Sequence, residues 1–74
     1  MKVQFIIEPG TRLGNGAEIP NPPMVEMDCV PRRGEMVAVR FGPDDTFETA
    51  LRVTYVYWTP FAYEYDVTIE LGRE

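Results

Sequence analysis

The sequence predicts an all-β fold, a small five-stranded barrel of the SH3-like or OB-like kind with a long irregular loop after its first strand. Several short segments alternate apolar and polar side chains, which is the period of two expected for half-buried strands. No segment repeats apolar residues at helical spacing over three turns, and prolines interrupt every window of helix length before residue 44. A chain of 74 residues forms one domain, residues 1–74, and its strands must curl together to bury one face each.

The first strand is predicted over residues 2–8, where Val3, Phe5 and Ile7 share one face. Residues 9–23 follow with four prolines, three glycines and no periodic apolar pattern. This composition predicts a long loop. Loops of this length are either mobile or involved in binding, and of these two alternatives mobility is favoured.

The second strand is predicted over residues 24–30, with Val25, Met27 and Cys29 on its apolar face. Pro31 closes this strand, and residues 31–34 form a tight turn that ends at a glycine. The turn leads into a third strand over residues 35–41, whose inner face carries Val37, Val39 and Phe41.

A turn over residues 42–45 precedes the longest predicted strand, residues 46–59, which is rich in β-branched and aromatic side chains. Val53 and Val56 are three residues apart and would face opposite ways in a regular strand, so a bulge is predicted near Thr54 or Tyr55. The final strand is predicted over residues 63–71. The predicted core consists of Val37, Val39, Val53, Val67 and Ile69.

Charge and cysteine content argue against several classes of protein. The net charge is −5, and residues 41–74 carry the whole acidic excess, which opposes the phosphate neutralisation needed for nucleic-acid binding. The single Cys29 cannot form an intrachain disulfide, which favours a reducing, cytoplasmic compartment. No apolar run is long enough for a membrane helix, and the first residues lack the pattern of a signal peptide.

The residue inventory leaves little room for catalysis. The sequence contains no histidine and no serine, so it offers no Ser-His-Asp triad, no Cys-His pair and no histidine-supported zinc site. Cys29 falls on the apolar face of its predicted strand and is expected to be a small buried hydrophobic residue. We therefore predict no catalytic residue, no cofactor site and no metal site within one chain.

Short polar clusters have simpler interpretations than binding sites. Gly14 to Gly16 lacks the lysine and hydroxyl residue of a phosphate loop, and residues 44–48 lack the spacing of a calcium loop. The Arg32-Arg33 pair is expected to contact Glu35 or to be solvated. Three carboxylates fall on the polar phase of the last predicted strand and are expected to face solvent: Glu64, Asp66 and Glu70.

Aromatic side chains are concentrated in residues 55–65. Alternation along the strands can bury only about half of them. The others are expected to form a surface patch of the kind found at protein interfaces. The predicted interaction surface consists of Tyr57, Trp58, Phe61 and Tyr63.

Three sequence patterns together resemble a group of short bacterial and phage β-barrel proteins found in prophages, integron cassettes and other mobile elements. The patterns are Pro31-x-x-Gly34-Glu35-x-Val37, Arg52-Val53-x-x-Val56-x-Trp58 and Tyr65-Asp-Val67-x-Ile69-x-Leu71. The resemblance covers roughly residues 30–72 and rests on positions that form the fold. It implies an SH3-like barrel with an accessory or assembly function.

The sequence leaves three functional hypotheses open. The leading one is a non-enzymatic interaction or assembly module that binds a second copy of itself or another protein through its aromatic turn. The alternative is a barrel that binds a small ligand, or an enzyme whose site forms only between subunits of a homo-oligomer, as similar plasmid-borne barrels with reductase activity imply. Binding of single-stranded nucleic acid by stacked aromatics is disfavoured by charge.

Overall fold

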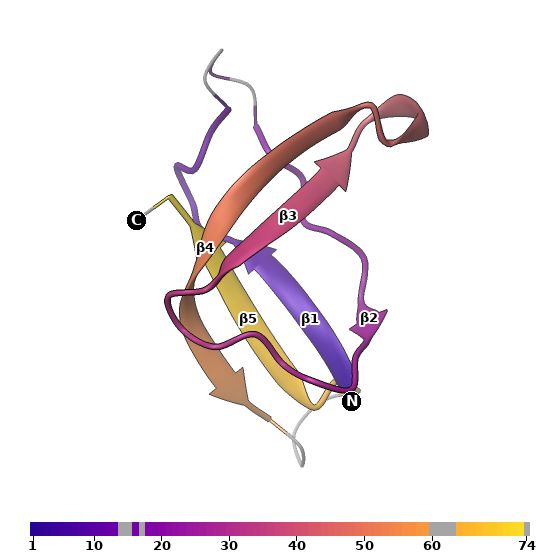
Figure 1. Ribbon diagram of the computed structural model, residues 1–74, viewed down its shortest axis with the longest axis vertical. Helices are drawn as coiled ribbons and strands as arrows, with labels where there is room; N and C mark the ends of the chain where they lie inside the picture. Colours follow the sequence, from indigo (N-terminus) through magenta and orange to yellow (C-terminus); the bar gives the residue numbers. More distant parts are fainter. Residues whose placement is uncertain (14–15, 17, 60–63, 74) are drawn as a thin grey trace.

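The computed structural model describes residues 1–13, 16, 18–59 and 64–73. They form one sheet of five strands that curls into a half-barrel (Figure 1). The elements are β1 (Lys2–Ile7), β2 (Val25–Glu26), β3 (Met36–Phe41), the 3-10 turn η1 (Pro43–Asp45), β4 (Phe47–Trp58) and β5 (Val67–Gly72). No α-helix occurs in the described ranges, so the predicted all-β class is confirmed.

The strand order in the sheet is β2-β1-β5-β4-β3. β1 and β5 run parallel at its centre, with Val3 opposite Val67 and Ile7 opposite Leu71. β4 is long enough to pair antiparallel with two strands, β3 along its first half and β5 along its second half. β2 and β3 are the two edges of the sheet and do not pair with each other, so the curled sheet stays open on one side.

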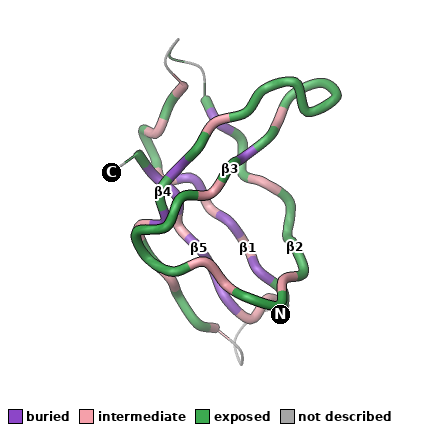
Figure 2. Tube along the Cα trace, in the orientation of Figure 1, coloured by how far each residue is buried: buried purple, intermediate pink, exposed green. Residues whose placement is uncertain are grey.

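The core lies on the concave face of the sheet, where the alternating side chains of β1, β4 and β5 meet. Figure 2 shows the buried positions concentrated along β1 and β5. The buried apolar residues are Val3, Phe5, Ile7, Ile19, Val39, Leu51, Val53, Val67, Ile69 and Leu71. The prediction was confirmed for four of its five core positions, and the fifth, Val37, is half-buried at the margin of the core.

The predicted bulge in the long strand is confirmed at Thr54. Val53 pairs with Leu71 and Tyr55 pairs with Glu70, so β4 has one residue more than β5 at this point. The Thr54 hydroxyl donates to Glu8 Oε2 at 2.7 Å and lies 3.2 Å from the Glu70 carbonyl oxygen. Because the side chains of a strand alternate, the extra residue reverses which positions of β4 face the core.

The second strand is much shorter than predicted, which corrects the boundaries 24–30. β2 contains only Val25 and Glu26, which pair with Val3 and Lys2 at the start of β1. The chain then leaves the edge of the sheet and crosses the concave face towards β3 (Figure 1). Apolar alternation in the sequence continued beyond the point where a neighbouring strand was available, so the pattern overestimated the length of the strand.

The final strand begins at Val67 rather than at residue 63. Residues 64–66 form a bend that is fixed by the main chain of its neighbours. The Asp66 N–H donates to the Lys2 carbonyl at 2.9 Å, and the Lys2 N–H donates to Asp66 Oδ2, also at 2.9 Å. The Thr59 N–H donates to the Asp66 carbonyl at 2.8 Å. The two main-chain bonds extend the pairing of β5 with β1 and β4 as far as Asp66, the last residue of the bend.

The long loop after β1 contacts the core through apolar side chains that its composition did not single out, among them Leu13. Ile19 is buried in the core, and the Asn21 side chain accepts a hydrogen bond from the Ile7 N–H at 2.8 Å. Arg12 and Glu18 form an isolated β-bridge and an ion pair with an N–O distance of 3.1 Å. The described part of residues 9–23 is therefore partly docked, and its predicted mobility stays a prediction.

The turn before β3 matches its predicted position. The Glu35 N–H donates to the Arg32 carbonyl at 3.0 Å, and Gly34 adopts a positive φ of 93°, which glycine takes without strain. The Gly34 N–H then donates to the Val53 carbonyl at 2.8 Å. This turn fixes the point at which the crossing segment joins the sheet.

Candidate binding groove

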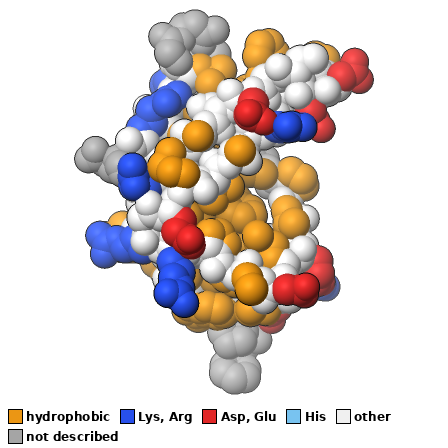
Figure 3. All heavy atoms as spheres, viewed as in Figure 1, with side chains coloured by type: hydrophobic (Ala, Val, Ile, Leu, Met, Phe, Trp, Pro, Cys, Tyr) orange, Lys and Arg blue, Asp and Glu red, His pale blue; other side chains and the backbone are white. Residues whose placement is uncertain are grey.

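An open apolar groove of about 1060 Å³ lies on the concave side of the half-barrel. Figure 3 shows this face hollowed at its centre, with hydrophobic side chains at the bottom of the hollow. We call it the groove. Its lining residues are Met1, Phe5, Met27, Asp28, Cys29, Val30, Pro31, Arg32, Arg33, Glu35, Met36, Val37, Val56 and Trp58.

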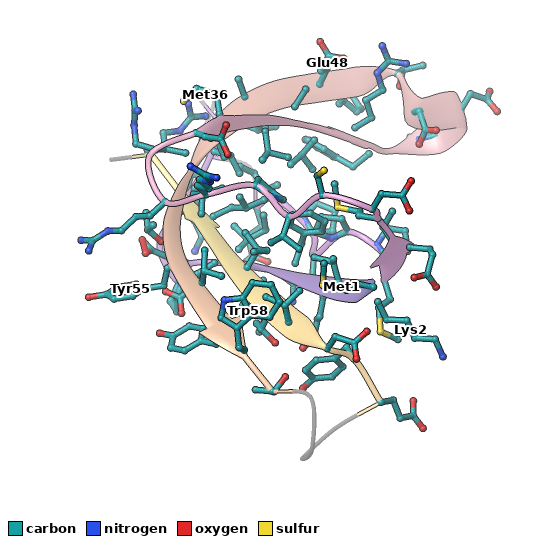
Figure 4. The ribbon with its side chains drawn as sticks, turned by 60° about the horizontal axis from the view of Figure 1, so that its bottom comes forward. Met1, Lys2, Met36, Glu48, Tyr55 and Trp58 are labelled. Carbon is teal, nitrogen blue, oxygen red and sulfur yellow. The ribbon has the colours of Figure 1, made fainter. Side chains whose placement is uncertain are left out.

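The bulge at Thr54 determines which aromatic side chains line the groove. In a regular strand, Val53, Tyr55 and Tyr57 would share one face. With the bulge, Val56 and Trp58 lie on the groove side instead. Figure 4 shows Trp58 on the side of β4 that faces Met1, whereas Tyr55 points away from that side. Trp58 remains 59% exposed, so its ring is available for contact with a partner.

The crossing segment, residues 27–35, forms one wall of the groove. Its beginning is tied to the first residue of the chain: the Met27 N–H donates to the Met1 carbonyl at 2.8 Å, and the Met1 amine donates to the Met27 carbonyl at 2.9 Å. The Met1 amine also pairs with Glu26 Oε2 at 2.7 Å, and this hydrogen bond raises the pKa of the amine. Met27 and Val30 pack against the core and hold the middle of the segment.

Four of the residues that line the mostly apolar groove are charged. Asp28, Arg32, Arg33 and Glu35 lie among its lining residues. The main-chain N–H of Arg32 donates to a Glu35 carboxylate oxygen, a contact that does not use the guanidinium group, so the expected side-chain contact stays a prediction. The Arg33 guanidinium lies 5.3 Å from the centre of the Tyr55 ring, within cation-π range. A mostly apolar hollow with a few polar groups at its margin is typical of binding sites.

Cys29 is exposed and lines the groove, which corrects the prediction that it is buried. The prediction assumed that a strand continued through residue 29 and turned the thiol inward. Because β2 ends at Glu26, Cys29 belongs to the crossing segment instead, and its side chain is no longer held against the core.

The outer face of β4 carries a separate aromatic pair. The rings of Tyr55 and Tyr57 stack with their centres 5.8 Å apart, and the Tyr57 hydroxyl donates to Glu70 Oε2 at 3.2 Å. Partial desolvation, together with the Glu70 carboxylate, raises the pKa of the Tyr57 phenol. Of the predicted interaction surface, Tyr57 and Trp58 are therefore both exposed but lie on opposite faces of β4. Phe61 and Tyr63 lie outside the described residues.

The three acidic residues predicted to face solvent differ in their surroundings. Glu64 is exposed as predicted, but Asp66 and Glu70 are half-buried, which corrects the prediction for these two. Asp66 accepts a hydrogen bond from the Lys2 N–H, and Glu70 accepts one from the Tyr57 hydroxyl. No group of three or more potential metal ligands occurs in the part of the chain that the structure describes. Within that same part, no helix is long and apolar enough to cross a bilayer.

Sequence reasoning missed the groove because its lining comes from a segment that had been assigned to a strand. The signal present in the sequence was its methionine content, which includes Met1, Met27 and Met36, since methionine is common at adaptable apolar binding surfaces. The spacing of Val53 and Val56 correctly indicated a bulge, but the side of β4 on which Trp58 lies depended on the position of the extra residue.

Searches against family models, curated proteins and solved structures found no match for this chain. The resemblance to mobile-element barrels therefore stays a prediction based on the residues quoted for it. The functional argument depends on the geometry of the groove itself.

Proposed function

We propose that this protein is a non-enzymatic interaction module that accepts an apolar anchor of a partner protein in the groove. The observation that carries the proposal is the position of Trp58, a large ring that is 59% exposed at an apolar hollow. Tryptophan is enriched among the side chains that dominate protein interfaces, above all where it borders a pocket that a partner can fill. The absence of histidine and serine from the sequence is consistent with a binding role.

The groove favours a partner that presents an aromatic or long aliphatic side chain in an extended segment. Its lining combines methionine, valine and aromatic side chains, which adapt to apolar groups of different shape. The charged side chains at its margin have both signs, Asp28 and Glu35 beside Arg32 and Arg33. These charges can orient a peptide main chain or polar side chain while the apolar anchor enters the hollow.

Selection from a displayed library of short linear peptides tests the proposal, and calorimetry then measures the affinity of the selected peptides. We expect the selected sequences to share an apolar anchor. Trp58→Ala should weaken their binding by about 10- to 30-fold, the effect of losing a central aromatic contact. Because Trp58 is largely exposed, its truncation leaves no large internal cavity, and the melting temperature should stay close to that of the wild type.

Tyr57→Ala is the matched control, since Tyr57 is the adjacent residue but lies on the outer face of β4. It should change the affinity by less than about twofold. Selected peptides whose binding depends on Tyr57 and not on Trp58 would place the contact surface on the outer face. A selection that yields no peptide above background would argue against a linear partner in the groove.

The second candidate is a small-molecule ligand, and the size of the groove favours it. The volume of about 1060 Å³ is near the upper end of typical small-molecule sites. A thermal-shift screen against nucleotides, folates, sugars and fatty acids separates the two candidates. A reproducible rise in melting temperature with one class, lost in Trp58→Ala, supports the ligand.

We propose a cytoplasmic location for either role, supported by the single exposed thiol of Cys29, which a reducing compartment would keep free.

A further inference from the structure

The outer edge of β3 is an unpaired strand edge, and we propose that it pairs with the β3 edge of a second copy of this chain. This contact differs from the groove, although two residues of β3, Met36 and Val37, belong to both. β3 is the last strand of the sheet, and only β4 pairs with it among the described residues. A strand edge of six residues is a template for pairing with another chain unless charges, proline or a covering segment protect it.

The main-chain groups that face the free edge follow from the pairing with β4. The Val53 N–H donates to the Glu35 carbonyl, and the Val53 carbonyl accepts from Gly34, each at 2.8 Å, so the main chain of Val53 faces the β3 side. Antiparallel pairing alternates along a strand. The main chains of Val37, Val39 and Phe41 consequently face β4, while those of Met36, Ala38 and Arg40 point away from it.

The free edge has little protection against pairing. β3 contains no proline, and its one charged side chain, Arg40, is engaged by Glu48 of β4 with an Nε–Oε2 distance of 2.7 Å. Met36 is 54% exposed, and Ala38 is exposed beside it. An edge of this kind usually carries a lysine or an inward-pointing charge when a protein remains monomeric.

The sequence of β3 is complementary to itself in one antiparallel register. A two-fold axis through Ala38 places Ala38 opposite Ala38 of the partner subunit, and Met36 opposite Arg40 of the partner subunit. Every outward N–H and C=O of these three residues then gains a partner, and the smallest side chain stands at the axis. Val37 meets Val39 of the partner subunit on the inner face, a pair of β-branched side chains that suits a sheet.

Two alternative registers, with the axis through Arg40 or through Val39, are less favourable. An axis through Arg40 places two guanidinium groups opposite each other, which is destabilising. An axis through Val39 sets Met36 against Gly42 of the partner subunit, but Gly42 has a φ of 85° and lies outside the strand. The main-chain groups of Met36 would then lack partners. The Ala38 register therefore defines which substitutions should affect association.

Sedimentation velocity over a 100-fold concentration range tests the pairing, with hydrogen exchange as a second readout. The wild type should shift from monomer to dimer as concentration rises. Ala38→Lys sets two ammonium groups opposite each other at the axis and should weaken association by at least about tenfold. Ala50→Lys is the control, because Ala50 is exposed on β4 directly opposite Ala38 but away from the free edge.

Met36 provides a test of the register that does not depend on the folding of the Ala38 variant. Met36→Glu places a carboxylate opposite the partner's Arg40 and should preserve or strengthen the dimer, whereas Met36→Arg places a like charge there and should weaken it. Amide exchange at Met36, Ala38 and Arg40 should slow as concentration rises. Trp58→Ala should leave the dimer unchanged, which separates this contact from the groove.

A wild type that remains monomeric across the whole concentration range would overturn the proposal. So would equal weakening by Ala38→Lys and Ala50→Lys, since that result would reflect charge on the hairpin and not pairing at the edge. Identical association of Met36→Glu and Met36→Arg would exclude the Ala38 register.

Discussion

At the scale of single residues, Thr54, Glu8 and Gly72 fix the bulge on which the groove depends. The Thr54 hydroxyl donates to Glu8, and the Glu8 carboxylate fills the space beside Gly72. A Cβ atom at Gly72 would lie 2.5 Å from Glu8 Oε1 and 3.4 Å from the Thr54 methyl group. A side chain at Gly72 would therefore displace the Glu8 carboxylate, although the φ of Gly72 is one that other residues adopt.

Gly72→Ala should destabilise the protein by about 1–2 kcal/mol, because the Glu8 carboxylate must move and lose its hydrogen bond to Thr54. In a Thr54→Val background that bond is already absent, so the same substitution should cost less than about 1 kcal/mol. The wild type, the two single variants and the double variant form a cycle. Denaturant unfolding of these four proteins measures the coupling free energy between Gly72 and Thr54. In a Thr68→Val background, Gly72→Ala should again cost about 1–2 kcal/mol, because the Thr68 hydroxyl contacts Gln4 and not Glu8. Equal costs in all backgrounds would show that Glu8 does not transmit the effect.

The Tyr57 phenol gives a pH dependence with a defined sign. Its pKa is raised in the folded protein by partial desolvation and by Glu70, so folding favours the neutral phenol. The stability from this group is complete below the unfolded pKa of about 10 and is lost as the pH rises through the higher folded value. Phenolate absorbance of the wild type minus that of Tyr57→Phe isolates this transition. A midpoint at or below about 10 would contradict the assignment.

At the scale of secondary-structure elements, the sequence predicted strands well where a neighbour exists along their whole length. β1, β3 and β4 lie within about one residue of their predicted bounds, and the distance between Val53 and Val56 located the bulge. The prediction failed for β2, because alternation alone cannot show that only Lys2 and Val3 are available for pairing. Cys29 and the groove were missed for the same reason.

For the loop after β1, the sequence did not indicate that Ile19 contacts the core, because an isolated buried side chain gives no periodic signal. Ile19→Ala should destabilise the protein by about 2–4 kcal/mol through loss of buried apolar contact. Glu18→Ala removes an exposed ion pair at the adjacent position and should change stability by less than about 1 kcal/mol. Thermal and denaturant unfolding measure both variants. A small effect of Ile19→Ala, equal to that of Glu18→Ala, would mean that the loop does not dock in solution.

At the scale of the whole molecule, the two ends of the chain form the centre of the sheet. β1 and β5 are parallel neighbours, although most of the chain separates them. No local pattern in the sequence indicates this pairing, which is why only the curled all-β class could be predicted and not the strand order. The arrangement leaves β2 and β3 as edges and keeps the concave face open between them.

Both proposals concern features found where the half-barrel is open. The crossing segment covers part of the concave face and leaves the groove beside Trp58, while β3 presents an unpaired edge. A closed barrel would have neither feature, because every strand edge would be paired and the interior would be filled by side chains. The half-barrel thus combines a small core with the open groove and the free edge of β3, the two surfaces on which the proposals rest.

The chemical-shift footprint of a selected peptide on the isotopically labelled protein tests the central claim most directly. If the groove is the binding site, the largest shifts should occur at Phe5, Val37, Val56 and Trp58. Tyr55 and Tyr57 on the outer face should then change little. A footprint centred on Tyr55 and Tyr57, with the Trp58 indole unperturbed, would contradict the account.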